Sequence, residues 1–285
     1  MNISIIGGDS RIVELVKILS EDKNNKIVLF GFGKCENLKQ YEQASNLIEA
    51  LQNSELIITS IPLSKDGKSI NTVYSEKNIL VEDLFNIAKN KKIITGKITD
   101  EIKGLIKPEN NNEILDVLSC EELTVLNAIP TAEGAIQIAM EKSSVTIHNS
   151  KCLILGFGRI GKILSKMLFG IGAQVYCEAR KQQDIAWIQS YGYNAIHLDK
   201  LNNYLNKFDF IFNTIPHVVL NNTNLGLIKK DCIIIDLASN PGGIDFEEAK
   251  KLNLQVEWAL ALPGKVAPKT AASYIYEIIK NNVQI

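Results

Sequence analysis

The sequence predicts an α/β protein of two doubly wound, Rossmann-like domains with parallel sheets, and three observations support this fold class. Short apolar runs alternate with helix-like segments, which is typical of βαβ units and a mostly parallel sheet. The alternation restarts near residue 150, so the chain contains it twice. At 285 residues the chain also exceeds the usual size of one domain.

The expected elements divide the chain near Asn127. In the first half, strands are expected at residues 2–6, 26–30, 55–61, 92–98 and 113–118, and helices near 11–19, 44–51, 81–88 and 100–106. In the second half, strands are expected at residues 151–155, 174–179, 195–198, 208–215, 232–237 and 255–262. Between the halves, Pro130 or Thr131 is expected to begin a helix, because Pro suits the first helical turn. The stretch from Leu262 indicates a rigid turn before a last helix from about Pro268 to Lys280. We therefore expect a first domain at residues 1–128, joined by the helix at 268–285, and a dinucleotide-binding domain at residues 129–267.

Composition excludes several function classes. Lys and Arg number 31 against 32 for Asp and Glu, so the basic excess that nucleic acid or an acidic membrane surface requires is absent. No apolar run approaches the roughly 20 residues of a membrane span. The five cysteines form no CxxC pair and the three histidines lie far apart, so we expect reduced cysteines and no metal site. The first residues predict a strand rather than a signal peptide, which favours the cytoplasm.

The strongest motif is the glycine-rich stretch that begins at Gly156. It follows an expected strand and opens an expected helix, and a second strand comes at the right interval. In that context GxGxxG predicts a dinucleotide site, because the backbone can approach a pyrophosphate at the helix N-terminus. Two later strand ends should flank the nicotinamide, although plain turn chemistry also explains them. The expected cofactor-binding residues are Gly156, Phe157, Gly158, Arg159, Ile160, Gly161, Arg180, Lys181, Thr214, Pro216, Ala238 and Ser239.

The cofactor choice depends on the end of the second strand of that domain. An NAD site places an acid there, on the ribose 2′-hydroxyl. The sequence instead reads Ala179, Arg180, Lys181, and Arg180 suits a 2′-phosphate, which favours NADP. If the register differs by one residue, Glu178 becomes the ribose acid and NAD is possible. We expect only one of Glu178 and Arg180 to face the ribose.

The first domain offers a second group of candidates. Arg is scarce, with Arg11, Arg159 and Arg180 the only three. Arg11 follows a Gly-Gly turn, so we expect its exposed guanidinium to bind an anion. The alternative is a capped helix with a solvated Arg. Ser60 ends another strand on the same expected rim. Gly31 and Gly33 form a second Gly-x-Gly that lacks the third glycine, and we interpret it as a turn.

Together these segments resemble the A subunit of dipicolinate synthase. Gly156–Gly161 is generic, but IPTAEG from residue 129, DLASNPGG from residue 236 and LPGKVAPKTA from residue 262 are specific, and the blocks span nearly the whole chain. The resemblance implies oxidation of dihydrodipicolinate from the lysine branch to dipicolinate during sporulation, in the mother cell. The partner that it implies is a flavoprotein-like B subunit. It also implies that helices link the two domains around a cleft.

The resemblance leaves the site residues as hypotheses. Arg11, with Thr131 and a helix N-terminus behind it, would bind one substrate carboxylate, and Lys265 or Lys269 the other. Ser60 is a further expected substrate-binding residue. Asp9 and His217 are candidate proton acceptors. Related 2-hydroxyacid dehydrogenases carry an Arg after the fifth strand and a later catalytic His. Here that stretch reads Ala238, Ser239, and no His follows His217. The alternatives are a non-catalytic dinucleotide-binding protein, or a related dehydrogenase for another small acid. We expect a homo-oligomer.

Overall fold

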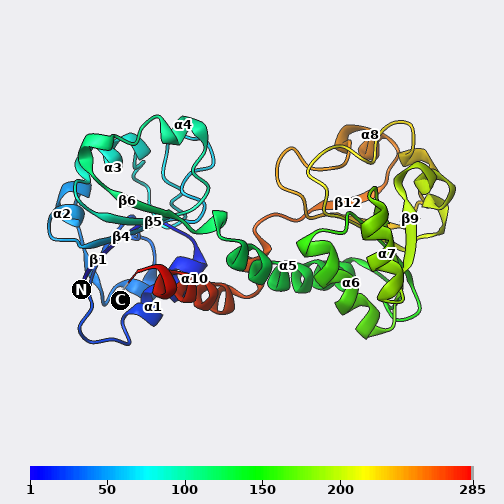
Figure 1. The fold of residues 1–285 in the computed structure, drawn as a ribbon, viewed down its shortest axis with the longest axis horizontal. Coiled ribbons are helices and arrows are strands. Elements are labelled where there is room, and N and C mark those ends of the chain that lie inside the picture. The colour runs from blue at the N-terminus through cyan, green and yellow to red at the C-terminus, as the bar shows by residue number, and fades with distance from the viewer. Residues whose placement is uncertain (284–285) are drawn as a thin grey trace. The chain divides into compact units, whose positions relative to one another are not determined.

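The computed structural model describes residues 1–283 and separates into two compact units. The first unit comprises residues 1–127 together with the chain from Ala267 onward, and the second comprises Ala128–Val266. Each unit contains one six-stranded parallel sheet with helices interleaved between its strands (Figure 1). The predicted fold class is confirmed: both units are α/β with a doubly wound parallel sheet.

The sheet of the first unit has the strand order β3-β2-β1-β4-β5-β6, and every neighbouring pair is parallel. Its strands are β1 (Asn2–Ile6), β2 (Lys26–Phe30), β3 (Glu42–Gln43), β4 (Leu56–Thr59), β5 (Lys92–Thr95) and β6 (Glu113–Asp116). Its helices are α1 (Ser10–Leu19), α2 (Leu47–Gln52), α3 (Val81–Ile87), α4 (Asp100–Lys103) and α10 (Pro268–Asn282), with 3-10 turns at Glu36–Leu38, Pro108–Asn110 and Val117–Ser119.

Both faces of this sheet are buried under helices, which is why β4 and most of β1 read as continuous apolar runs. One face packs against α1 and α10, through buried side chains such as Ile12, Leu15 and Ile275. The other face packs against α2 and α3, through side chains such as Leu51 and Phe85. The carboxyl ends of the strands are left for the loops that carry the candidate residues.

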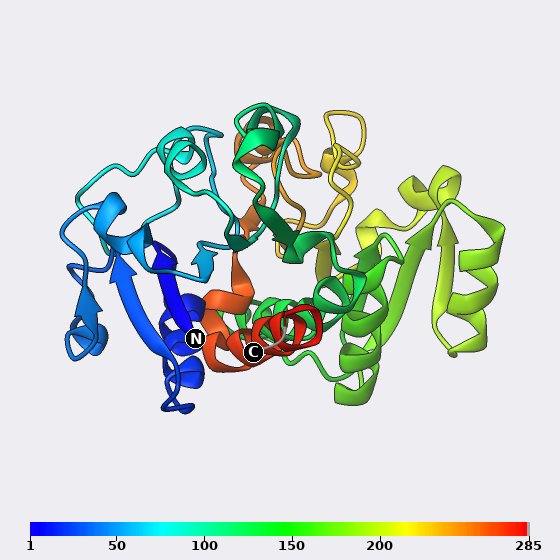
Figure 2. The ribbon, with the colours of Figure 1, turned by 60° about the vertical axis from the view of Figure 1, so that its left-hand side comes forward.

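The second unit repeats the strand order, as β9-β8-β7-β10-β11-β12, again all parallel (Figure 2). Its strands are β7 (Lys151–Leu155), β8 (Gln174–Ala179), β9 (Asn194–His197), β10 (Phe210–Asn213), β11 (Ile233–Asp236) and β12 (Gln255–Trp258). Its helices are α6 (Arg159–Ile171), α7 (Gln182–Ser190), α8 (Phe246–Lys251) and α9 (Leu262–Val266), with 3-10 turns at Leu198–Asn203, Leu205–Lys207 and Leu225–Leu227. The order matches the dinucleotide-binding arrangement, whose ligand crosses the carboxyl ends of the central strands.

Two local predictions were wrong. The helix expected to begin at Pro130 or Thr131 is α5 (Glu121–Lys142), which begins nine residues before Pro130 and contains it. A proline removes one backbone hydrogen bond, but the flanking turns persist because Ala128, Ala132 and Ala135 are buried. The rigid turn expected from Leu262 is instead the short helix α9. Among the described residues, no helix is both long and apolar enough to cross a membrane.

Candidate dinucleotide-binding site

The three glycines of the loop after β7 meet three different steric demands. Gly156 has a φ of +89°, and a Cβ there would lie 2.7 Å from the Thr214 hydroxyl oxygen. A Cβ on Gly161 would lie 2.2 Å from the Gly156 carbonyl oxygen, so this glycine lets α6 pack against the loop. A Cβ on Gly158 would meet no atom within 4 Å. Gly158 therefore leaves open space beside the backbone, as a closely approaching pyrophosphate requires.

The N-terminus of α6 is suited to an anion. Its N-cap residue is Gly158, which supplies no side-chain cap, and the first turn contains no acidic residue. The first amide hydrogens of a helix lack partners within the helix and carry a partial positive charge. Arg159 is exposed at the start of the helix, and Ile160 is half-buried. Phe157 is buried in the core, with the Lys162 ammonium 5.8 Å from the centre of its ring.

At the end of β8, an acid and a base occupy different environments. Glu178 is fully buried, and one of its carboxylate oxygens accepts a 3.2 Å hydrogen bond from the Gly156 amide. The other oxygen, Oε1, has no hydrogen-bond partner among the described residues. Burial raises the pKa of the Glu178 carboxyl, and the Gly156 hydrogen bond and the nearby Arg180 and His197 oppose this effect only in part.

Arg180 lies beyond the strand, because β8 ends at Ala179, and its side chain is exposed together with that of Lys181. We expected the alternation of side chains along the strand to let only one of Glu178 and Arg180 face the ribose. That expectation assumed that both residues belong to the strand, which was wrong. The Arg180 side chain is not constrained by the pleat. Both groups stand near the end of β8, with the acid below the glycine loop and the base exposed to solvent.

Two buried side chains connect the ends of β10 and β11, and neither was among the predicted site residues. The Asn213 amide donates to the Asp236 carboxylate over 2.7 Å and to the Ile215 carbonyl over 3.0 Å. Asp236 also accepts hydrogen bonds from the amides of Ala238 and Gly243, at 3.0 and 2.8 Å. Both side chains are fully buried. They hold together the two loops that were expected to flank the nicotinamide, and a buried polar residue ending each of two neighbouring strands is the signal that could have identified them.

The predicted site residues on those two loops differ in their exposure and in their hydrogen bonds. The Thr214 hydroxyl donates to the Leu155 carbonyl over 2.8 Å, which connects its loop to the end of β7. Pro216, His217 and Ser239 are exposed, and Ala238 is buried. His217 forms no hydrogen bond with residues 1–283, so its imidazole is available to a ligand.

In the first unit, the prediction of an exposed Arg11 was wrong. Its side chain is buried, and Nε and Nη2 bind the Asp9 carboxylate, with the shortest contact at 2.7 Å. Nη2 also donates to the Ile61 carbonyl. Asp9 is the N-cap of α1 and accepts from the Arg11 amide, so the candidate proton acceptor also fills the start of that helix. Nη1 makes no hydrogen bond within the described chain and is the part of the guanidinium left for a ligand.

The other predicted substrate-binding residues lie on separate elements. Ser60 is fully buried and its hydroxyl donates to the Leu63 carbonyl over 2.8 Å. Thr131 is half-buried within α5, Lys265 is exposed in the last turn of α9, and Lys269 is exposed near the start of α10. That these side chains surround one substrate stays a prediction. Within residues 1–283, no group of His, Cys, Asp and Glu side chains could hold a metal ion.

A parallel-sheet unit with this glycine loop defines an NAD(P)-binding oxidoreductase, and the family comparisons agree. Residues 129–241 match the D-isomer specific 2-hydroxyacid dehydrogenase NAD binding domain, and residues 2–117 match the N-terminal domain of the dipicolinate synthase A subunit. The chain is 31% identical to the dipicolinate synthase A subunit of Bacillus subtilis (strain 168) over 281 residues, covering 98% of this chain and 94% of that protein. It therefore belongs to the family of dipicolinate synthase A subunits.

Solved structures of relatives have the same fold. The crystal structure of the dipicolinate synthase A subunit from Bacillus halodurans matches with a TM-score of 0.87 and 27% identity, covering 99% of this chain and 97% of that one. The crystal structure of its counterpart from Bacillus subtilis matches with a TM-score of 0.85 and 28% identity, covering 100% and 96%. The resemblance drawn from the sequence motifs is confirmed at the level of the family.

Proposed function

We propose that the chain oxidises dihydrodipicolinate to dipicolinate with NADP. The observation that carries the proposal is the loop at Gly156–Gly161, with its uncapped helix N-terminus and the exposed Arg180 at the end of the next strand. A relative of nearly the same length, 31% identical, is named as the A subunit of dipicolinate synthase, and this name supplies the substrate class. We propose that the reaction takes place in the cytoplasm of the mother cell during sporulation.

The reaction asks mainly for positioning. NADP, when bound, would supply the hydride acceptor, and a base of the protein would take the proton that is lost as dihydrodipicolinate becomes an aromatic pyridine dicarboxylate. Aromatisation supplies the driving force, and the protein must orient the ring and neutralise two carboxylates. His217, which is exposed and forms no hydrogen bond with residues 1–283, is the proton acceptor that we favour, because Asp9 is paired with Arg11. The Nη1 group of Arg11 and the ammonium groups of Lys265 and Lys269 are the cations proposed for the carboxylates.

NADP is favoured over NAD by the burial of Glu178. A buried acid whose pKa is raised is a poor anionic acceptor for a ribose hydroxyl, whereas the exposed Arg180 can form charge-assisted bonds to a 2′-phosphate. We expect NADPH to bind more tightly than NADH in a fluorescence titration. Arg180→Ala should remove most of the difference, about 1–3 kcal/mol, and Arg159→Ala serves as the control for general phosphate attraction. Equal affinities in the unmodified chain would support Glu178 as the ribose ligand and NAD as the cofactor.

A turnover assay distinguishes the proposed reaction from a non-catalytic dinucleotide-binding role and from a dehydrogenase of another small acid. Purified chain should reduce NADP when dihydrodipicolinate is generated in the assay, with dipicolinate as the product detected by absorbance. NADPH binding without turnover, with or without a B subunit, would favour a non-catalytic dinucleotide-binding role. Turnover of another small acid in preference to dihydrodipicolinate would favour the dehydrogenase alternative.

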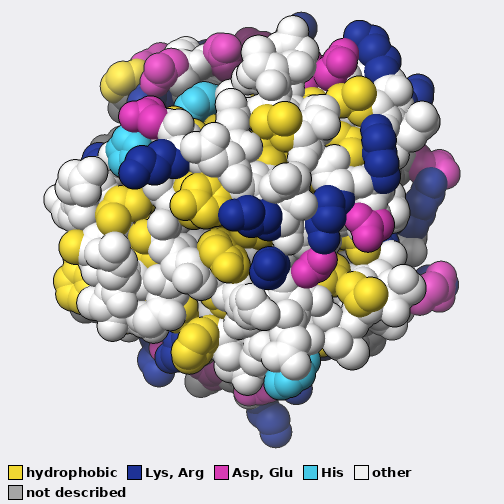
Figure 3. Space-filling view, turned by 90° about the vertical axis from the view of Figure 1, so that its right-hand side faces the viewer, with side chains coloured by type: hydrophobic (Ala, Val, Ile, Leu, Met, Phe, Trp, Pro, Cys, Tyr) yellow, Lys and Arg dark blue, Asp and Glu magenta, His cyan; other side chains and the backbone are white. Residues whose placement is uncertain are grey.

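We propose that the chain has a B subunit for its partner, and an aromatic surface on the second unit supports a protein contact. Trp187 and Tyr191 stack with ring centres 5.6 Å apart, and Tyr193 connects Tyr191 to Phe169. Trp187, Tyr191 and Phe169 are 54%, 49% and 53% exposed, and exposed aromatic clusters are enriched at interfaces. Figure 3 shows hydrophobic side chains reaching the surface of this unit between charged ones.

The partnership is tested by size-exclusion chromatography of the chain mixed with a B subunit. We expect a complex that Trp187→Glu weakens and that Ile48→Glu, at an exposed site on the first unit, leaves intact. Absence of a complex with the unmodified chain would contradict the partnership. Light scattering of the chain alone tests the proposed homo-oligomer, which requires a mass above 31.6 kDa.

A further inference from the structure

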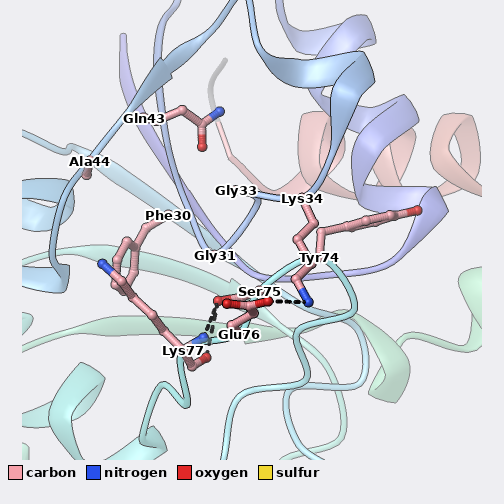
Figure 4. A pocket seen from close by; sticks show the side chains of 10 residues that line it. All are labelled: Phe30, Gly31, Gly33, Lys34, Gln43, Ala44, Tyr74, Ser75, Glu76 and Lys77. Atoms are coloured by element: carbon pink, nitrogen blue, oxygen red, sulfur yellow. Dashed lines mark hydrogen bonds and ion pairs between the residues drawn. The ribbon is translucent and has the colours of Figure 1, made fainter.

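A cavity of about 400 Å³ lies in the first unit at the carboxyl end of β2. Figure 4 shows its lining, which comes from the loop after β2, from β3 and from the segment at residues 74–77. Phe30, Ala44 and Tyr74 supply apolar surface, and Lys34 and Lys77 supply ammonium groups. None of these residues belongs to the cofactor-binding or substrate-binding sets described above.

Gly33, predicted from the sequence to be part of a turn, lies on the lining of this cavity. Its φ lies outside the left-handed region, and a Cβ there would meet no atom within 4 Å. Neither backbone conformation nor packing therefore requires glycine at this position. Gly31 differs, because it has a φ of +90° and a Cβ would lie 3.1 Å from Ile79. Gly33 lies on the cavity lining, and its missing side chain leaves open space there.

The charges on the lining favour an anion. The Lys77 ammonium lies 5.8 Å from the centre of the Phe30 ring and donates to the Ser45 carbonyl over 2.9 Å, and it forms no ion pair with residues 1–283. Lys34 forms a 2.8 Å ion pair with Glu76, whose side chain is 78% exposed. An ion pair this exposed contributes little stability, so a ligand carboxylate can compete for Lys34. Two cations against one carboxylate leave the lining with one net positive charge.

A dinucleotide is excluded from the phosphate position of this unit. The N-terminus of α1 is filled by the Asp9 carboxylate. The segment at residues 70–73 crosses the glycine turn after β1: Gly8 pairs with Thr72, and a Cβ on Gly7 would lie 2.7 Å from the Thr72 methyl carbon. The segment at residues 70–73 therefore occupies the space beside Gly7, and the Ile12 side chain of α1 occupies the space beside Gly8. The occupant of the cavity must be a smaller molecule.

We infer that this cavity binds a single-ring aromatic carboxylate. Its carboxylate pairs with Lys77 and exchanges with Glu76 for Lys34, and its ring lies against the apolar surface of Phe30, Ala44 and Tyr74. The inference concerns the first unit alone and does not depend on NADP or on turnover. It assigns to the β2 end of this unit a ligand site separate from the glycine loop of the second unit.

The test is a titration of the full chain, without cofactor, with benzoate and with pyridine-2,6-dicarboxylate. Saturable shifts of the backbone amide NMR signals of Gly31 and Gly33 are expected, because these signals report this cavity and not another carboxylate site. Lys77→Gln should weaken binding about tenfold, as expected for loss of a charge-assisted contact. Gly33→Leu should abolish it by filling the space.

Matched controls guard against general effects. Lys39→Gln removes an exposed lysine paired with Glu36 outside the cavity, and Gly226→Leu fills open space in the second unit. Both should bind as the unmodified chain does, and so should Arg180→Ala, even if the cofactor proposal fails. The inference is overturned if the Gly31 and Gly33 signals do not shift, or if Lys77→Gln and Gly33→Leu bind normally. Stronger shifts with adenosine 5′-monophosphate than with either carboxylate would also overturn the ligand class.

Discussion

At the scale of a single residue, burial has a larger effect than any partner on the pKa of the Glu178 carboxyl. The carboxyl group loses its hydration and receives one hydrogen bond, from the Gly156 amide. Desolvation disfavours the charged form, so the folded-state pKa lies above its ordinary value of 4.5. The folded state then holds its proton to higher pH than the unfolded state does. The contribution of Glu178 to the free energy of unfolding is therefore greatest at low pH, and it is lost as the pH rises through the raised pKa.

Glu178→Gln should remove this part of the pH dependence. Denaturant unfolding from about pH 4 to pH 8 should show the stability of the unmodified chain, relative to that of the variant, falling as pH rises above 4.5. The amide keeps an acceptor for the Gly156 amide and never ionises. Glu247→Gln, at an exposed position of α8, is the control. A constant difference between Glu178→Gln and the unmodified chain over this range would contradict a raised pKa.

Arg11 is now expected to affect folding as well as turnover. Its guanidinium holds the α1 cap residue Asp9 and the Ile61 carbonyl from a buried position. Arg11→Lys keeps the charge but cannot make both contacts, so the free energy of unfolding should fall by about 1–3 kcal/mol. Lys17→Arg, on the same helix, is the control. An unchanged thermal midpoint together with lost turnover would show that Arg11 acts on substrate alone.

Helices α1 and α6 occupy equivalent places in their units but differ at their first turn. Helix α1 begins at Asp9, whose carboxylate satisfies the helix from within the chain. Helix α6 begins at Gly158, which offers no side chain, and its first turn contains no acidic residue. One helix N-terminus is therefore filled and the other is open to phosphates, although the two sheets share one strand order.

The glycines of the α6 loop can be separated by alanine substitution. Gly161→Ala places a Cβ 2.2 Å from the Gly156 carbonyl oxygen, so the helix must move away from the strand, and both stability and NADPH affinity should fall. Gly158→Ala meets no protein atom within 4 Å, so the thermal midpoint should hold while NADPH affinity falls. Equal NADPH binding by Gly158→Ala and the unmodified chain would show that the pyrophosphate does not approach this position.

At the scale of the whole molecule, the last helix completes the hydrophobic core of the first unit. Helix α10 inserts Ile275, Ile278 and Ile279 into the core beside α1, each at most 2% exposed. The two helices that meet in that core, α1 and α10, come from opposite ends of the sequence. The first unit is therefore discontinuous in the chain, whereas the second is one continuous segment.

Ile275→Ala should destabilise the first unit by about 2–5 kcal/mol, through lost burial and a cavity. Both tryptophans, Trp187 and Trp258, lie in the second unit, so their fluorescence reports that unit alone. We expect an earlier unfolding transition by circular dichroism and an unchanged tryptophan transition. The exposed substitution Lys280→Ala should alter neither signal. Equal shifts in both signals for Ile275→Ala would show that the units unfold together.

Much of the architecture follows from local and periodic features of the chain. Alternating apolar runs predict parallel strands because a strand covered on both faces excludes polar side chains, and glycine spacing predicts the loop because only certain backbone positions tolerate a Cβ. Helix limits were predicted less well. Pro130 marked a helix start by local preference, but packing of small residues along α5 carried the helix through it.

The sequence by itself determined the fold class, the dinucleotide loop and the family, because these depend on residue spacing within short segments. Only the tertiary structure decided which charged groups are open to ligands. Arg11 is buried because a carbonyl 50 residues away reaches it, and Glu178 is buried because a loop 22 residues earlier in the chain covers it. Burial and partnership are set by contacts between distant segments, and those contacts have no local signature in the sequence.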